Sequence, residues 1–202
     1  MANVLIIGDS QAGNPGAAAA AALEAAGHTV TRIHHDGQSP VRYETAGAQP
    51  NAPGDSVSPY DDLRSQYKAL AAGKDVVVLI FGHNSPAGTA TRNALIQMKS
   101  DVHAPVLMSG PPLYPPTARP TSGGQASRVV GDALRAQNQR IFTTRYIDAY
   151  PSTPADLPRD ANGWHFTPGS AQGWGQAIAE AVGRFLAGAP AGGGGGTTLG
   201  PH

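Results

Sequence analysis

The stretch Val4-Leu5-Ile6-Ile7-Gly8-Asp9-Ser10 places a run of aliphatic residues directly before a glycine, an acid and a hydroxyl. Four consecutive aliphatic residues predict a strand buried on both faces, as in the middle of a parallel sheet. Gly8 lets the backbone turn sharply out of such a sheet, so Ser10 stands where a small molecule can reach it. Ser10 is therefore a candidate nucleophile. Serine also ends strands in α/β proteins that have no chemistry, so the assignment depends on the residues at the ends of the other strands.

Beyond Ser10, apolar strand-like runs alternate with helix-like segments. Predicted strands cover residues 28–33, 75–82, 104–109 and 144–148. Predicted helices cover residues 17–26, 59–73, 89–100 and 124–140, and a last helix begins near Gly169 with an apolar face of Ala171, Trp174, Ile178, Val182 and Phe185. This alternation predicts an α/β fold, namely a three-layer α/β/α sandwich around a five-stranded parallel sheet in the flavodoxin-like order 2-1-3-4-5.

Two segments stand apart from this alternation. Residues 39–59 are rich in Pro, Gly, Ala, Asn and Ser, which predicts a long loop. The chain of 202 residues fits one domain, which we expect over residues 1–187. Residues 188–202 include an unbroken glycine run and predict a flexible tail, which an assembly partner could hold.

Composition excludes several classes of protein. The formal net charge is +0 and the pI is about 7.1, so the sequence carries no basic footprint for nucleic acid. The absence of cysteine excludes disulfides and thiol catalysis. The N-terminus has no basic region, and its apolar segment is too short for a signal peptide or a membrane span. These features argue against general secretory export and favour a cytoplasmic protein or a component of an assembly such as a virion.

Chemically suggestive residues come after several of the predicted strands. Ser10 comes after the first strand, Gly37 after the second and Asn84 after the third, while His165 lies in the loop after the last. Ligands of parallel α/β sheets bind beyond the carboxyl ends of the strands, near the point where the strand order reverses. We therefore expect these residues to lie on one rim of the sheet.

These residues resemble the sequence blocks of a known enzyme superfamily. In order and spacing, Gly8-Asp9-Ser10, Gly37, Gly82-His83-Asn84 and His165 are similar to the four blocks of the SGNH (GDSL-type) hydrolases, over about residues 4–186. The resemblance implies an esterase, lipase, acyl-thioesterase or carbohydrate O-deacetylase that needs no cofactor.

The resemblance also implies a role for each residue. A serine hydroxyl needs a base within hydrogen-bond reach, and that role falls to His165. The negative charge that develops on the carbonyl oxygen needs preorganised donors. By resemblance, these oxyanion-hole donors are the backbone N–H groups of Ser10 and Gly37 and the side-chain amide of Asn84.

One position departs from the family pattern. The family has an aspartate three residues before the histidine, where this chain has Asn162, and the nearest preceding acid is Asp160. Three arrangements are open: Asp160 reaches His165 through a rearranged loop, a Ser-His dyad works with a backbone or amide partner such as Asn162, or the site is weak or inactive.

Other candidates for chemistry are weaker. The adjacent His34 and His35 point opposite ways on an extended segment and have no companion ligands, so we expect no metal site. Asp9 is expected to be structural, and His83 either lines the pocket or lies at the surface.

The sequence thus predicts a serine esterase acting on a small-molecule or carbohydrate ester, with acetate as the simplest acyl group. The alternative is an inactive SGNH-fold module that serves a structural or binding role in a virion or envelope complex.

Overall fold

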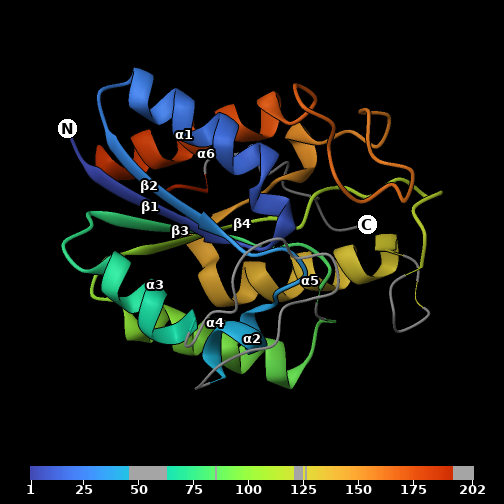
Figure 1. Ribbon diagram of the computed structural model, residues 1–202, viewed down its shortest axis with the longest axis horizontal. Coiled ribbons are helices and arrows are strands. Elements are labelled where there is room, and N and C mark those ends of the chain that lie inside the picture. Colours follow the sequence, from blue (N-terminus) through green and yellow to red (C-terminus); the bar gives the residue numbers. More distant parts are fainter. Residues whose placement is uncertain (46–62, 85, 121–124, 126, 193–202) are drawn as a thin grey trace, which may run out of the picture.

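The computed structural model describes residues 1–45, 63–84, 86–120, 125 and 127–192 (Figure 1). Its strands are β1 (Asn3–Gly8), β2 (Thr29–His34), β3 (Val76–Ile80), β4 (Val106–Ser109) and β5 (Tyr146–Ile147). All neighbouring strands pair in parallel, in the order β2-β1-β3-β4-β5. The predicted five-stranded sheet and its strand order are therefore confirmed.

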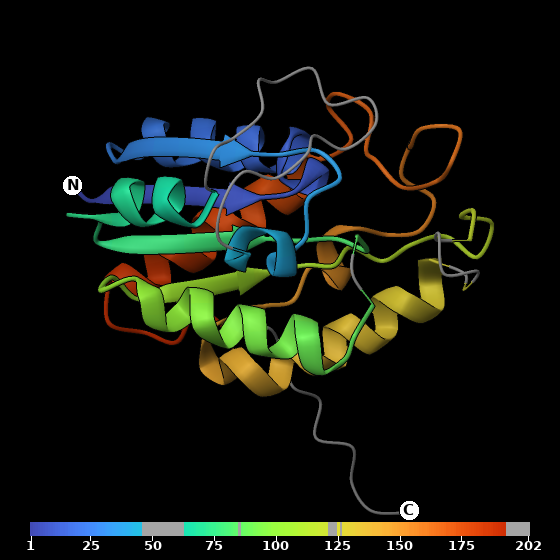
Figure 2. The same ribbon diagram turned by 60° about the horizontal axis from the view of Figure 1, so that its bottom comes forward.

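Helices cover both faces of this sheet (Figures 1 and 2). One face carries α1 (Asn14–Ala25) and α6 (Gln172–Leu186). The other carries α2 (Pro40–Glu44), α3 (Leu63–Ala71), α4 (Thr89–Asp101) and α5 (Ser127–Phe142). The result is the predicted three-layer α/β/α sandwich.

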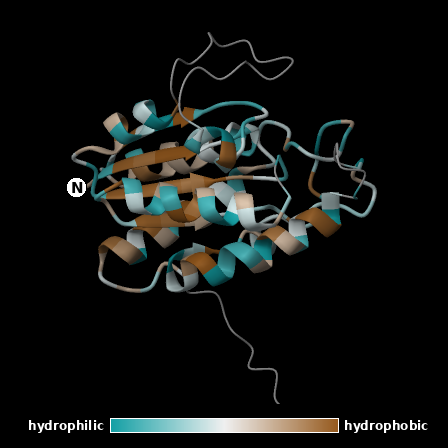
Figure 3. Cartoon of the chain, turned by 90° about the horizontal axis from the view of Figure 1, so that it is seen from below, coloured by the Kyte–Doolittle hydropathy of each residue, from teal (hydrophilic) through white to brown (hydrophobic). Residues whose placement is uncertain are grey.

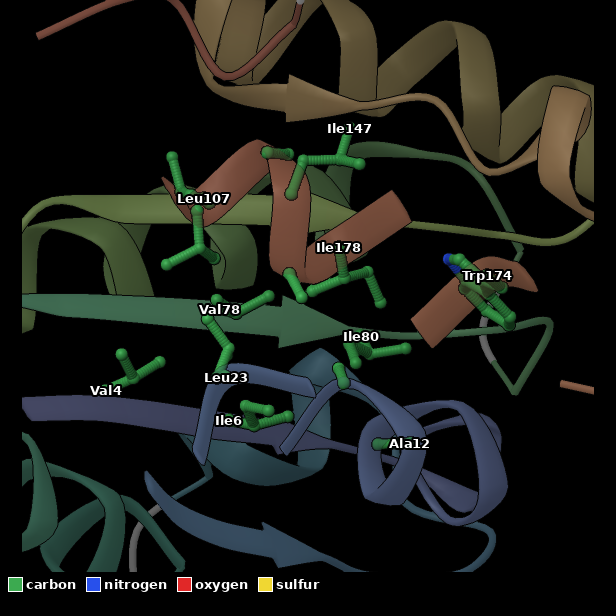
Figure 4. Close-up of a cluster of buried hydrophobic side chains, with 14 of the residues drawn as sticks. Val4, Ile6, Ala12, Leu23, Val78, Ile80, Leu107, Ile147, Trp174 and Ile178 are labelled. Carbon is green, nitrogen blue, oxygen red and sulfur yellow. The ribbon is translucent and has the colours of Figure 1, made fainter. Parts of the chain in front are cut away.

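The two core layers follow from the alternation of side chains along β1. Val4 and Ile6 point toward α1 and α6, while Leu5 and Ile7 point to the opposite face, and all are fully buried. Figure 3 shows the strands as the most hydrophobic part of the cartoon. Figure 4 shows the first layer, in which Trp174 of α6 packs beyond the end of the sheet. The indole N–H of Trp174 donates to Ser109 Oγ at 2.8 Å, so its polar atom is satisfied although the side chain is buried.

Small residues bring α1 and α6 into very close contact. A Cβ atom on Gly175 of α6 would lie only 2.4 Å from Ala18 Cβ and 2.7 Å from the Ala19 backbone nitrogen of α1. The alanine-rich sequence of α1 is therefore explained by this contact, because larger side chains would hold the helices apart.

The segment predicted as a long loop over residues 39–59 begins with the short helix α2. The prediction is wrong there because Ser39 caps this helix, accepting a hydrogen bond from the Arg42 backbone N–H, and Pro40 begins it. The buried Tyr43 then anchors the helix by donating its hydroxyl proton to Gly8 O at 2.8 Å. The rest of the predicted loop, from residue 46, lies outside the described residues.

The end of the chain also differs in detail from the expected boundaries. The last strand is shorter than residues 144–148, because a 3-10 turn occupies Thr143–Arg145. After α6, Ala191 is buried and the Gly192 N–H donates to Thr144 O at 3.1 Å, so packing continues to Gly192. The remainder of the predicted Gly-rich tail, 193–202, lies outside the described residues. Within the described part of the chain, no helix has both the length and the apolar character needed to cross a membrane.

Candidate active site

Ser10, His165 and Asp160 form a continuous hydrogen-bonded row at the carboxyl edge of the sheet. Ser10 begins the 3-10 turn after β1, and its Oγ lies 2.7 Å from His165 Nε2. The other ring nitrogen of His165, Nδ1, lies 2.8 Å from Asp160 Oδ2. With the Nδ1 proton donated to the carboxylate, Nε2 is left to accept the serine proton.

The loop before α6 folds back on itself and so brings Asp160 to His165. The Asp160 backbone N–H donates to His165 O at 2.8 Å, and the Gly163 N–H donates to Asp160 O at 2.9 Å. Gly163 adopts a positive φ of 75°, which a residue with a side chain rarely adopts. The tight turn at Gly163 therefore allows an acid five residues before the histidine to reach it, where the family pattern has the acid three residues before.

Backbone donors hold the Asp160 carboxylate in place. The N–H groups of Asn162 and Trp164 donate to Asp160 Oδ1 at 3.1 and 2.9 Å, which leaves Oδ2 for His165. Burial alone would raise the pKa of Asp160, but the hydrogen bonds from His165 and Trp164 outweigh it and lower the pKa. The carboxyl is thus kept ionised, as a partner of an imidazolium must be.

Asn162 takes part in this loop through its backbone. Its N–H donates to Asp160, and its carbonyl accepts from the Arg119 N–H at 2.9 Å. Of the three arrangements left open by the sequence, the geometry agrees with the first, in which Asp160 rather than Asn162 faces His165.

Two side chains tie this loop to the segment that carries Ser10. The Gln11 amide donates to Trp164 O at 3.0 Å, and the Asn14 amide donates to Phe166 O at 2.7 Å. Both donors lie within four residues of Ser10, and both acceptors belong to the residues next to His165. These bonds therefore hold the segment of Ser10 against the segment of His165.

The buried Asp9 carboxylate organises the residues after β3. Its Oδ2 accepts from the Gly82 backbone N–H at 2.9 Å and from the Asn84 side-chain amide at 2.8 Å, while Oδ1 accepts from the Gln11 N–H. Burial raises the pKa of Asp9 to about 6 in spite of these bonds. Asp9 is therefore structural, as expected, and its particular task is to hold Asn84.

The predicted oxyanion-hole residues meet at one pocket of about 470 Å³. It is lined by Ser10, Gly13, Asn14, His34, Asp36, Gly37, His83, Asn84, Trp164 and His165. Within the described part of the chain, the backbone N–H groups of Ser10 and Gly37 donate to no protein acceptor, so both can serve a ligand. The Asn84 amide also lies 3.3 Å from Gln38 O, a longer contact than the one to Asp9. The structure thus brings together Ser10, Gly37, Asn84 and His165 as expected.

Two residues of this region were missed or left open by the sequence. His83 is buried against Tyr114, whose hydroxyl lies 2.9 Å from His83 Nδ1, and its ring lies 4.7 Å from that of Trp164. Tyr114 comes from the Pro-rich segment after β4, where no periodicity marks it. The adjacent His34 and His35 diverge as predicted, because His34 lines the pocket while His35 is buried beside Gln66.

The fold resembles solved structures of ester hydrolases. A protein proposed to be an arylesterase, from Agrobacterium tumefaciens, superposes with a TM-score of 0.66 and 18% identity, over 90% of this chain and 98% of that one. A carbohydrate acetylesterase family member from Sinorhizobium meliloti superposes with a TM-score of 0.62 and 16% identity, over 93% and 100%. A proposed GDSL-like lipase from Parabacteroides merdae gives a TM-score of 0.56 and 11% identity, over 87% and 92%.

By contrast, no protein-family model and no curated protein sequence matches the chain. The likeness therefore lies in the three-dimensional arrangement of the chain, over 87–93% of its length. On this basis the chain has the fold of the SGNH (GDSL-type) hydrolases.

Proposed function

We propose that this protein is a serine esterase that uses Ser10 as nucleophile, His165 as general base and Asp160 as the partner of His165. The observation that carries the proposal is the unbroken row of hydrogen bonds from Ser10 Oγ through the imidazole to Asp160 Oδ2, at 2.7 and 2.8 Å. A nucleophile within reach of a base, and a base oriented by a third group, is the arrangement that acyl transfer to serine requires.

The geometry supports a two-step acyl transfer. His165 Nε2 takes the Ser10 proton as Oγ attacks the ester carbonyl carbon, and the carbonyl oxygen becomes negatively charged. His165 then gives this proton to the leaving alcohol, and an acyl group remains on Ser10. Water, deprotonated by His165, attacks the acyl-enzyme and releases the acid and free Ser10.

The charge on the carbonyl oxygen is met by the backbone N–H groups of Ser10 and Gly37 and by the Asn84 amide. The Asn84 amide has two hydrogens, one held by Asp9 at 2.8 Å and the other directed to Gln38 O at 3.3 Å. The second hydrogen makes only this longer contact, so it is the one that can be shared with the substrate oxygen while Asp9 holds the first. Each such donor contributes roughly 10²–10³ in rate.

The substrate we propose is an acetyl or similarly small acyl ester of a carbohydrate or another polar alcohol. The residues that line the pocket include the polar side chains of Asn14, His34 and Asp36 beside the ring of Trp164. These polar side chains can hydrogen-bond to the hydroxyl groups of such an alcohol, and one of the similar structures is a carbohydrate acetylesterase family member. The chemistry itself requires no cofactor.

The alternative of an inactive structural module was motivated by Asn162 standing at the usual position of the acid. The approach of Asp160 to His165 weakens that motive. A further ground is the Gly-rich tail, whose residues 193–202 lie outside the described residues.

Hydrolysis of p-nitrophenyl acetate by the wild type and by Ser10→Ala tests the proposal. We expect Ser10→Ala to lower kcat/KM at least ~10³-fold, because the attacking atom is removed. Ser100→Ala is the matched control, since Ser100 is exposed on α4 and its hydroxyl bonds only to Gln97 O within that helix. Circular dichroism of all three proteins checks folding. A Ser10→Ala protein that keeps a tenth or more of wild-type activity would refute the mechanism.

A further inference from the structure

His83 occupies a place in the pocket that the proposed mechanism does not use. It stands between Gly82 and Asn84 directly after β3, is 8% exposed, and lines the same pocket as Ser10 and His165. Its ring packs edge-on against Tyr114 at 5.1 Å between centroids and lies 4.7 Å from the Trp164 ring. An imidazole packed between two aromatic rings has a fixed orientation.

The Tyr114 hydroxyl determines which ring nitrogen of His83 carries the proton. Tyr114 is fully buried, and burial keeps its pKa well above 10, so the hydroxyl remains protonated. A buried hydroxyl proton needs an acceptor, because leaving it without one is costly. Within the described part of the chain, the acceptor in reach of this hydroxyl is His83 Nδ1 at 2.9 Å, so the Tyr114 proton is donated to Nδ1. With Nδ1 accepting, a neutral imidazole must carry its proton on Nε2.

His83 stays neutral over the pH range in which a serine esterase works. Burial, with a smaller contribution from the positive charge that His165 can carry, lowers the pKa of His83 to about 4. His83 is thus a donor through Nε2 rather than a second base competing with His165.

The Nε2–H group of His83 has no partner within the described part of the chain. The imidazole makes its hydrogen bond through Nδ1. Its Nε2 atom is not sealed from solvent, as a buried atom without a partner would be. Since the side chain lines the pocket, this donor is available to a ligand there.

The position of His83 relative to His165 indicates which part of a substrate it meets. The leaving alcohol must lie next to His165, because His165 returns the proton to it. Trp164 lies beside both histidines, with ring centroids 4.7 Å from His83 and 6.5 Å from His165. Because His83 and His165 also line the same pocket, an alcohol that lies next to His165 is placed in the part of the chain's surface that His83 borders.

We propose that the Nε2–H of His83 donates a hydrogen bond to a second oxygen on the alcohol part of the substrate, close to the ester, and so selects esters of polyhydroxylated alcohols. Tyr114 is the positioning residue that holds this donor. Gly82 is required for the arrangement, since a Cβ there would lie 2.9 Å from the Tyr114 hydroxyl and 2.4 Å from Gln11 Cγ. This inference rests on the proposed esterase function and adds a specificity residue to it.

A pair of esters that differ in one hydroxyl tests the proposal. Cyclohexyl acetate and trans-2-hydroxycyclohexyl acetate are compared by acetate release. One hydrogen bond corresponds to roughly a 3- to 10-fold difference, so we expect the wild type to prefer the hydroxylated ester by about that factor in kcat/KM. His83→Phe keeps an aromatic ring without a donor and should bring the ratio to about one. His83→Gln retains a side-chain N–H and should restore part of the preference.

His103→Phe is the matched control, because His103 is exposed at the start of the segment before β4, and its ratio should equal that of the wild type. A preference that survives in His83→Phe would overturn the proposal while leaving the esterase function intact. Absence of hydrolysis of both esters by the wild type would overturn the esterase function and, with it, this inference.

The tautomer is checked without any turnover. In protein labelled with ¹⁵N-histidine, NMR at pH 7 should show His83 neutral with its proton on Nε2. Tyr114→Phe should abolish this fixed tautomer and lower the preference for the hydroxylated ester. A His83 proton on Nδ1 in the wild type would contradict the proposed donor.

Discussion

Asp160 lies five residues before His165, yet its Oδ2 stands 2.8 Å from the imidazole Nδ1. The turn at Gly163 makes this possible, because it reverses the chain so that the Asp160 N–H reaches His165 O. The acid and the histidine thus form the two ends of one small backbone loop. Their distance is set locally and does not depend on packing between remote elements.

The roles of the two candidate acid positions can be separated by mutation. Asp160→Asn should lower kcat by roughly 10³–10⁴, because an amide can hold His165 in the wrong tautomer and cannot stabilise the imidazolium. Asn162→Ala should change kcat less than about 10-fold, since the contacts of Asn162 in this loop are made by its backbone. Steady-state kinetics on p-nitrophenyl acetate measure both. The opposite order of effects would show that Asn162 supports His165.

The contribution of Asp9 to the free energy of unfolding should fall as the pH rises, which is the reverse of the usual behaviour of a carboxyl group. The folded protein holds the Asp9 proton up to about pH 6, whereas an unfolded aspartate loses it near 3.8, so the folded state binds more protons in this window. The contribution of Asp9 to stability is therefore full below pH 3.8 and is lost as the pH rises through about 6. In Asp9→Asn this dependence disappears.

Urea denaturation of the wild type and Asp9→Asn at pH 4 and pH 7.5 measures the effect. The difference in unfolding free energy, wild type minus variant, should be larger at pH 4 by on the order of 2–3 kcal/mol. Asp160→Asn provides a control of opposite sign. Its lowered pKa gives a contribution present above the unfolded value and lost as pH falls, so that difference should grow toward pH 7.5. Equal differences for Asp9→Asn at the two pH values would contradict the buried, proton-retaining carboxyl.

Two glycines of α6 should respond in opposite ways to alanine. At Gly175 the new Cβ would meet Ala18 Cβ at 2.4 Å and the Ala19 nitrogen at 2.7 Å, so Gly175→Ala should destabilise the fold by about 1–3 kcal/mol or more. At Gly183 nothing lies within 4 Å of a Cβ, so Gly183→Ala should stabilise it by about 0.5–1 kcal/mol. Urea midpoints of the two variants and the wild type compare them directly. Similar midpoints for both variants would argue against the close α1–α6 contact.

Much of the fold could be predicted because its signals are local. The apolar run of β3, Val76–Ile80, is buried on both faces, and its uniform hydrophobicity predicts a central parallel strand. Once the strands are placed, topology alone brings Ser10, Gly37 and Asn84 to one edge. The sequence predicts too long a strand at β5, because the residues before it are strand-like in sequence but form a 3-10 turn.

The parts that escaped prediction depend on single contacts. Tyr43 anchors α2 with a hydrogen bond to Gly8 O, and no periodicity in the sequence reveals this contact between residues 35 positions apart. Tyr114 settles the state of His83 across 31 residues in the same way. Asp160 was one of several candidates, because the positive φ of Gly163 that turns the loop cannot be derived from spacing.

The close contact of small residues between α1 and α6 has a consequence for the positions of Ser10 and His165. Ser10 and His165 are 155 residues apart, but the first leads into α1 and the second into α6. Where the backbones of two helices are in direct contact, no side chain between them can adjust and the distance between the helices is fixed. The positions at which the preceding loops join the helices are then fixed as well. The Ala18–Gly175 contact therefore works as a spacer of fixed length for the Ser10–His165 pair. The accuracy of a site at the edge of the sheet is in this way built from residues that have no functional groups at all.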